Sequence, residues 1–191
     1  MFHTWKNRPE SYTTDDNSVT INAPEGTDYF NDPASELRKR NAPMFVRGVS
    51  GDFTVQGRVM PEFTSTFDAG ALVFYCSDEV WVKLAFEQTD MGDTSIVTVV
   101  TNGLSDDANG EVVDDAEVYL KMTRRDDAIG LYYSVDGERW RMVRLFSLPV
   151  PDRTACYVGV SAQSPLGSGC TVRFTGIEFT DHSVEDLRSG V

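Results

Sequence analysis

Residues 80–87 read VWVKLAFE, and their side chains alternate between two kinds at every second position. Such alternation is typical of a β-strand, because successive side chains of a strand point to opposite faces of the sheet. One face is entirely apolar and consists of Val80, Val82, Leu84 and Phe86. The opposite face consists of Trp81, Lys83, Ala85 and Glu87. The segment therefore predicts a strand with one face in a core and an exposed tryptophan, a cation and a carboxylate on the other.

Segments of the same kind recur from Asp52 onward, each closed by Gly, Asp, Asn or Pro. The pair Asp136-Gly137 is typical of a hairpin turn between two such segments. The predicted strands are 52–60, 69–76, 80–88, 94–102, 116–125, 128–135, 140–147, 155–163 and 170–179. Short strands in succession, without a long helical pattern, favour an all-β jelly-roll β-sandwich of two packed antiparallel sheets.

The two ends of the chain are expected to complete this sandwich. Residues 1–50 contribute loops and shorter strands, which are predicted around Trp5, 19–21 and 44–46. Segment 31–40 is interpreted as a short helical turn or a loop. The polar tail 182–191 is expected to fray or to form a short helix. The length, without a linker-like stretch, predicts one domain over residues 1–191.

The chain is strongly acidic, with 30 Asp and Glu against 17 Lys and Arg and a formal net charge of −13. Such a charge repels phosphate backbones and anionic membrane surfaces, so neither nucleic acid nor a membrane is an expected partner. Solubility is the simplest use of the charge. A protein partner with a basic patch is the alternative.

The chain has three cysteines, Cys76, Cys156 and Cys170, which lie far apart and form no C-x-x-C pair. All three fall in or beside apolar strand patterns, so we expect buried free thiols. Residues 1–10 contain no apolar segment of the kind found in secretory leaders. Free thiols persist in the cytosol, so the expected location is cytoplasmic.

The same alternation places further polar side chains opposite the core in 118–125 and 158–163. If these strands share a sheet with 80–88, its outer face combines an aromatic ring with charged and amide groups. Rings pack against the C–H faces of sugars while charged and amide groups hold their hydroxyls. The predicted ligand-binding residues are Trp81, Lys83, Glu87, Lys121, Arg125 and Gln163. Arg58, Thr101, Tyr132 and Ser134 are candidates to join them.

Each of these residues also has a purely structural interpretation. Lys, Glu and Arg commonly decorate the solvated face of an antiparallel sheet, and an exposed Lys83–Glu87 pair contributes little to stability. Trp81 is alternatively a packing residue under a neighbouring loop. The acidic pairs at 106–107, 114–115 and 126–127 are interpreted as turns rather than calcium ligands.

Signatures of catalysis are sparse. His3 and His182 lie near the termini, which leaves no evident catalytic triad or His-rich metal site. Glycoside hydrolysis needs two carboxylates flanking a cleft, and Glu87 has no evident partner in the sequence. We therefore predict no catalytic residue, no metal ligand and no cofactor.

Several segments in order resemble a family of concanavalin-like domains of unknown function (domain of unknown function 1349), which includes the yeast regulation-of-enolase protein. The segments that carry the resemblance are Thr27-Asp28-Tyr29, Gly51-Asp52-Phe53, Asp68 to Leu72, Trp81 to Leu84 with Glu87, Ser95 to Thr98, Thr101 to Asp106, Ser134 to Gly137 before Trp140 and Arg144, Val158-Gly159-Val160 before Ser164-Pro165, and Val172 with Phe174. The resemblance implies a concanavalin- or laminin-G-like jelly roll. In one respect the chain departs from the family, since Asp107 stands where an aromatic residue is expected, so a pocket that used that ring differs here.

The sequence leaves three functions open. The first is a non-catalytic binding domain for a carbohydrate or other polyhydroxylated metabolite. The second is a protein-interaction or metabolic regulatory protein. The third is a glycoside-acting enzyme in which Glu87 serves as acid or base.

Overall fold

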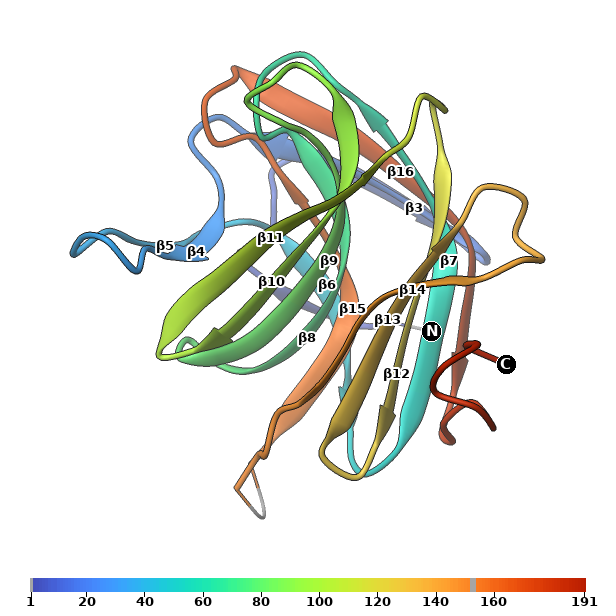
Figure 1. The fold of residues 1–191 in the computed structure, drawn as a ribbon. Coiled ribbons are helices and arrows are strands. Elements are labelled where there is room, and N and C mark those ends of the chain that lie inside the picture. Colours follow the sequence, from blue (N-terminus) through green and yellow to red (C-terminus); the bar gives the residue numbers. More distant parts are fainter. Residues whose placement is uncertain (1, 152–153) are drawn as a thin grey trace.

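The computed structural model describes residues 2–151 and 154–191, and its regular elements are strands in two large antiparallel sheets that face each other (Figure 1). The first sheet has the order β1 (Thr4–Lys6), β6 (Met44–Val49), β15 (Cys156–Gln163), β8 (Ala69–Ser77), β9 (Val80–Gln88), β10 (Thr94–Asn102) and β11 (Leu104–Val112). The second sheet has the order β14 (Arg141–Ser147), β13 (Ala128–Ser134), β12 (Val118–Arg125), β7 (Phe53–Glu62), β16 (Gly169–Thr180), β3 (Ser18–Pro24) and β2 (Tyr12–Asp15). The chain is thus an all-β, jelly-roll-like sandwich, as its alternation predicts.

The core lies between the two sheets and contains the apolar faces that the sequence predicts. From β9 it takes Val82, Leu84 and Phe86, which are fully buried. Alternate residues of β12 and β15 meet them there: Val118, Leu120, Met122, Val158, Val160 and Ala162. The period of two therefore assigned the inner faces correctly.

Segment 31–40 contains no helical turn; residues 32–37 form a loop, as the alternative expected, but strands flank it on both sides. It belongs to a hairpin of β4 (Tyr29–Asn31) and β5 (Arg38–Arg40), whose strands pair with each other. Figure 1 shows the hairpin on the side of the first sheet that faces away from the second sheet. An Asx turn at Asp32, which accepts bonds from Ala34 N and Ser35 Oγ, reverses the chain between its strands.

Strand β11 was not predicted, because its sequence LSDDANGEV is rich in residues typical of turns. It forms the edge of the first sheet, pairs with β10 and leaves most of its side chains exposed. An exposed edge strand needs only one partner and no apolar face, which explains the missing signal. The interpretation of Asp106 and Asp107 as turn residues is therefore wrong.

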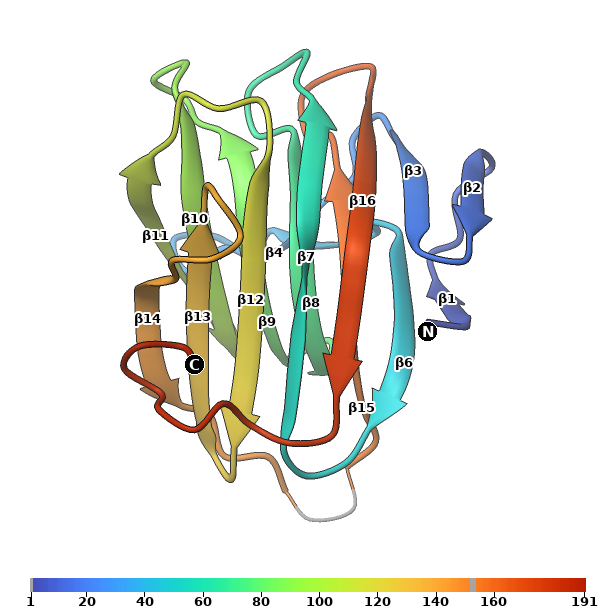
Figure 2. The ribbon, with the colours of Figure 1, turned by 90° about the vertical axis from the view of Figure 1, so that its right-hand side faces the viewer.

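The C-terminal segment 182–191 neither frays nor forms a helix, but crosses the outer face of the second sheet (Figure 2). Lys121 Nζ donates to Gly190 O at 2.9 Å, and Tyr132 Oη donates to Leu187 O at 2.6 Å. Arg125 Nε donates to Ser183 Oγ at 2.9 Å. Donors from β12 and β13 thus hold the tail.

The prediction of three free thiols is wrong for two of them. Cys76 and Cys156, at the ends of the neighbouring strands β8 and β15, form a disulfide. Cys170 is a free, buried thiol, and burial raises its pKa to about 12. The cytoplasmic location was predicted from three free thiols, so it now has the support of Cys170 alone.

Leu84→Ala is expected to reduce the free energy of unfolding by about 2–5 kcal/mol, because it removes buried atoms and leaves a cavity between the sheets. Leu166→Ala is the matched control, since Leu166 is 68% exposed. Urea denaturation measures both. Equal effects of the two substitutions would contradict the placement of the core.

Candidate functional site

The outer face of the first sheet carries two rows of polar side chains separated by small ones. In one row Lys83 pairs with Val99, which pairs with Asp107. In the other, Ala69 pairs with both Gln163 and Glu87. The row between them holds Ser161, Ala71 and Ala85. These short side chains leave a hollow between the long ones.

A second apolar cluster covers the part of this face next to the hollow. The Trp81 indole lies in the cluster, only 1% exposed, and packs edge-to-face with Tyr29 of β4 at 5.7 Å between ring centroids. Met44, Val46, Val73 and Tyr75 are the other large side chains of the cluster, together with Val97 and Val99. The face that was expected to be solvated is therefore half covered by the β4–β5 hairpin.

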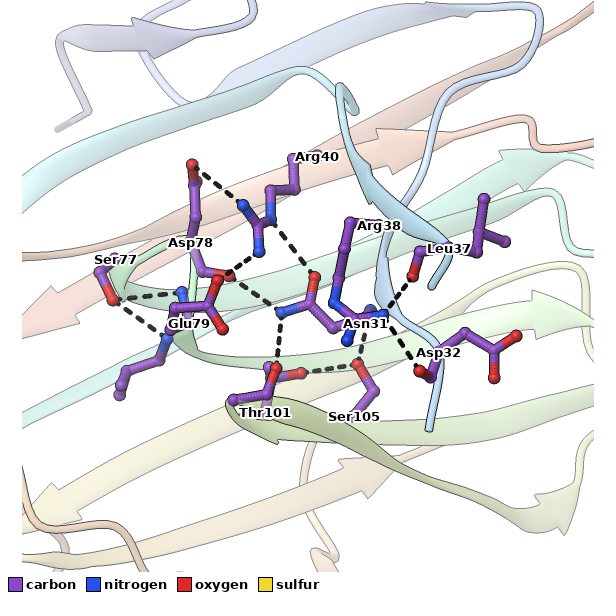
Figure 3. A network of polar contacts seen from close by, with 12 residues as sticks. Asn31, Asp32, Leu37, Arg38, Arg40, Ser77, Asp78, Glu79, Thr101 and Ser105 are labelled. Atoms are coloured by element: carbon purple, nitrogen blue, oxygen red, sulfur yellow. Dashed lines mark hydrogen bonds and ion pairs between the residues drawn. The ribbon is translucent and has the colours of Figure 1, made fainter. Parts of the chain in front are cut away.

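Asn31 fastens this hairpin to the turns at one end of the first sheet (Figure 3). Its Nδ2 group donates to Asp78 O at 3.1 Å and to Gly103 O at 2.9 Å. Its backbone N–H donates to Ser105 Oγ at 2.9 Å, and Arg40 Nε donates to its Oδ1 atom at 3.3 Å. One fully buried amide thus bridges two turns and both hairpin strands.

A pocket of about 170 Å³ opens beside the hairpin, above the hollow. It is lined by Asp28, Phe30, Phe67, Lys83, Glu87, Val99, Asp107 and Gln163. These residues come from the loop before β4, from β4 itself, from the loop before β8, and from strands β9, β10, β11 and β15. The pocket therefore exists only because distant parts of the chain meet on one face.

Lys83 is 4% exposed, and its ammonium group is held by three acceptors. Its Nζ atom donates to Gln163 Oε1 at 2.7 Å, to Asp28 Oδ1 at 3.3 Å and to Tyr29 O at 3.4 Å. The amide of Gln163 in turn donates to Phe67 O at 3.0 Å and to Glu87 Oε2 at 3.4 Å. Lys83, Gln163 and Glu87 thus form a continuous buried polar network.

Glu87 is 7% exposed, and burial raises its pKa to about 8. The nearby charge of Lys83 opposes this rise, whereas Asp107, Asp28 and Asp90 add to it. Burial likewise raises the pKa of Asp107. Glu87 is therefore a neutral acid at pH 7, able to donate as well as accept a hydrogen bond.

The structure brings together three of the predicted site residues, Lys83, Glu87 and Gln163. It separates two others, because Lys121 and Arg125 lie in β12 on the outer face of the second sheet, under the C-terminal segment. The assumption of one shared sheet is wrong for β12. Arg58, Tyr132 and Ser134 also belong to the second sheet, while Thr101 belongs to the first. Trp81 is a buried packing residue and not an exposed ring for a ligand. This is the alternative role that the sequence left open for it.

Five pocket residues were not predicted: Asp28, Phe30, Phe67, Val99 and Asp107. Phe67 has a φ of 67°, a conformation that bulky residues rarely adopt and that is concentrated at functional sites. Its backbone is held by Phe67 N donating to Gln88 O at 2.7 Å. Asp28 belongs to a segment that matches the family pattern. Asp107 is the position at which the chain departs from that pattern. Neither shows the alternation that identified the other residues.

The fold and pocket together define a class of protein: a jelly-roll-like sandwich with a small polar pocket on the outer face of one sheet. The chain belongs to the family described as protein of unknown function (DUF1349), whose model matches residues 5–182. Regulation of enolase protein 1 from Saccharomyces cerevisiae is 27% identical over 173 residues, which cover 90% of this chain and 86% of the yeast protein.

Solved structures confirm the fold. A functionally unknown protein from Saccharomyces cerevisiae superposes with a TM-score of 0.86 at 26% identity, over 93% of this chain and 95% of that one. The carbohydrate binding module CBM66 from Bacillus subtilis gives a TM-score of 0.54 at 13% identity, over 93% and 96%. A xylan beta-1,4-xylosidase from Bacillus halodurans gives 0.63 at 18% identity, over 85% of this chain but only 32% of the enzyme. No helix within the described part of the chain is long and apolar enough to cross a membrane.

Asn31→Ala is expected to reduce the free energy of unfolding by about 1–3 kcal/mol, because it leaves Asp78 O and Gly103 O without their donor. Asn102→Ala, at an exposed position, is the control. Hydrogen exchange should show faster exchange in the β4–β5 hairpin of Asn31→Ala only. An unchanged hairpin would contradict the role of this amide.

Glu87→Gln is expected to flatten the dependence of stability on pH. The pKa of Glu87 in the folded protein, about 8, lies above the ordinary value of 4.5, so its contribution to stability is full below pH 4.5 and is lost as pH rises through about 8. Urea denaturation at pH 5, 6.5 and 8 measures the difference between parent and variant. Glu178→Gln, on the exposed face of β16, should leave the parent's pH dependence in place.

Proposed function

We propose that the pocket beside the β4–β5 hairpin binds a small polyhydroxylated ligand such as a single sugar residue. One observation carries this proposal: Lys83, Glu87 and Gln163 converge from two strands into one buried network that opens into a cavity. Buried polar groups that converge on a cavity fix the orientation and specificity of a ligand. Phe30 and Phe67, both half-buried in its wall, offer rings to the C–H faces of a sugar.

The size of the pocket supports a small ligand. A cavity of about 170 Å³ lies below the roughly 300–1,000 Å³ of pockets that hold drug-sized molecules. It suits one ring with its hydroxyl groups better than a chain of several. A carbohydrate binding module and a xylosidase share the fold at low identity, which supports the proposal by analogy of fold alone.

The extent of the domain and the location of the protein in the cell are further parts of the proposal. Strands from both ends of the chain lie in each sheet, since β1 and β15 belong to the first and β3 and β16 to the second. We therefore propose that residues 1–191 act as one domain. A cytoplasmic location is retained from the sequence alone, without the support of Cys76 and Cys156.

A regulatory or protein-binding role is the second candidate, and the name of the yeast relative favours it. It is compatible with the first, because a pocket that senses a metabolite is one way to regulate a partner. A partner that co-purifies with the parent but not with a charge reversal at Asp28 would support it.

A glycoside-acting enzyme is the third candidate, and the protonated state of Glu87 at neutral pH favours it. A general acid must hold its proton at the working pH, and Asp28 and Asp107 supply further carboxylates in the same pocket. Turnover of any member of a chromogenic glycoside panel, abolished in Glu87→Gln, would support this candidate over binding alone.

Lys83→Met is expected to abolish binding of a sugar ligand, because it releases Gln163 and Asp28 from the ammonium group that holds them in the pocket wall. Lys121→Met is expected to leave binding unchanged. Both lysines are buried, at 4% and 6% exposure, but they lie on the outer faces of different sheets. A thermal-shift screen of mono- and oligosaccharides finds the ligand, because a molecule that binds only the native state raises the melting temperature. Gln163→Ala serves as a second pocket variant if Lys83→Met folds poorly. A ligand that stabilises all four proteins equally would contradict this site.

A further inference from the structure

The pocket is lined by more acidic than basic side chains. Lys83 is the one cation among the described residues that line it, against the carboxyl groups of Asp28, Glu87 and Asp107. The Lys83 ammonium is also already paired, since its three donors are matched by Gln163 Oε1, Asp28 Oδ1 and Tyr29 O. It therefore has little left to offer an anionic ligand.

Glu87 is a buried group whose bonding capacity is used only in part by the protein. Its carboxyl accepts a bond from Gln163 Nε2 at 3.4 Å, whereas the same amide reaches Phe67 O at 3.0 Å. A carboxyl group, protonated or ionised, can take part in several hydrogen bonds, so most of the bonding capacity of Glu87 remains for the content of the pocket. The side chain is more than nine-tenths buried, and it lines the cavity.

Asp107 gives this arrangement its second carboxyl group. It lies in the same row as Lys83, two strands away on β11, at the exposed side of the pocket. The residue next to it in the chain, Asp106, points to the opposite face of β11 and forms an ion pair with Arg144. Glu87 and Asp107 thus line the same small cavity from two strands.

We propose that the ligand carries a protonated amine on its polyhydroxylated frame, as an amino sugar or an aminopolyol does, and that Glu87 and Asp107 receive this amine. The inference rests on the proposed sugar-binding function of the same pocket and names its ligand class. Charge-assisted bonds between an ammonium and a carboxylate are roughly twice as strong as neutral ones. Phe30 and Phe67 add ring faces that attract a cation.

The state of Glu87 without ligand fits this assignment. Burial raises its pKa to about 8, and the groups that face it are Lys83 of its own strand, Asp107 of β11, Asp28 of the loop before β4 and Asp90 after β9. An arriving ammonium supplies the missing positive charge, lowers that pKa and expels the proton to solvent. Binding of a cationic ligand at pH 7 is therefore expected to release a proton, whereas binding of a neutral sugar is not.

Titration calorimetry with matched pairs of probes tests the inference: glucosamine against glucose, galactosamine against galactose, and glucamine against sorbitol. At least one amine is expected to bind about ten- to hundredfold more tightly than its neutral counterpart. Its apparent enthalpy should depend on the ionisation enthalpy of the buffer, which reports the released proton. N-acetylglucosamine, which lacks the charge, and glucose 6-phosphate should both bind more weakly than the amine.

Glu87→Gln should remove the preference for the amine and the proton release while retaining weak binding of the neutral sugar. Glu178→Gln, on the exposed face of the second sheet, is the matched control and should behave as the parent does. Asp107→Asn provides an independent variant at an exposed position if Glu87→Gln folds poorly.

The outcomes separate the two proposals. A neutral sugar that binds as tightly as its amine, or an unchanged preference in both Glu87→Gln and Asp107→Asn, overturns the ligand class and leaves the sugar-binding function standing. Tighter binding of glucose 6-phosphate, or of Ca²⁺ alone, likewise overturns it. If no sugar, polyol or amine of the panel binds, the proposed function itself fails.

Discussion

The buried ammonium group of Lys83 is the constraint around which the candidate site is arranged. A buried ion is costly unless partners replace its water, and no neighbour on its own strand does so. Gln163 reaches it from β15, while Asp28 and the carbonyl of Tyr29 come from the segment that leads into the hairpin. Pairing this charge therefore also draws the hairpin over the sheet, where Tyr29 covers Trp81.

Each sheet has a buried lysine on its outer face, and the two ammonium groups have different partners. On the second sheet the buried ammonium of Lys121 donates to Gly190 O and lies 3.8 Å above the ring of Trp140. Its cover is the C-terminal segment, and its pKa is lowered to about 8 by desolvation. Lys121 thus meets a carbonyl and a ring, whereas Lys83 meets a carboxylate, an amide and a carbonyl. The arrangement around Lys83 leaves a cavity lined by the carboxyl groups of Asp28, Glu87 and Asp107.

Sequence reasoning was accurate wherever burial imposes a period of two. It identified the strands that contain Leu84, Leu120 and Val160, because alternate apolar residues must face the core on each of them. It missed β11, whose exposed edge position imposes no such period, and it missed the short strands β4 and β5 on either side of the loop 32–37. Hairpin strands of three residues carry too few positions for any period to be recognised.

The amino-acid sequence alone was enough to establish the sandwich, its inner faces and the presence of Lys83, Glu87 and Gln163 opposite the core, because alternation along one strand is a local property. It left open which strands are neighbours, and so Lys121 and Arg125 were assigned to the wrong group. Tertiary structure decided that Trp81 is covered, that Cys76 meets Cys156, and that Asp28, Phe67 and Asp107 join the pocket. These are contacts between segments far apart in the chain, and no local pattern records which distant segments will meet.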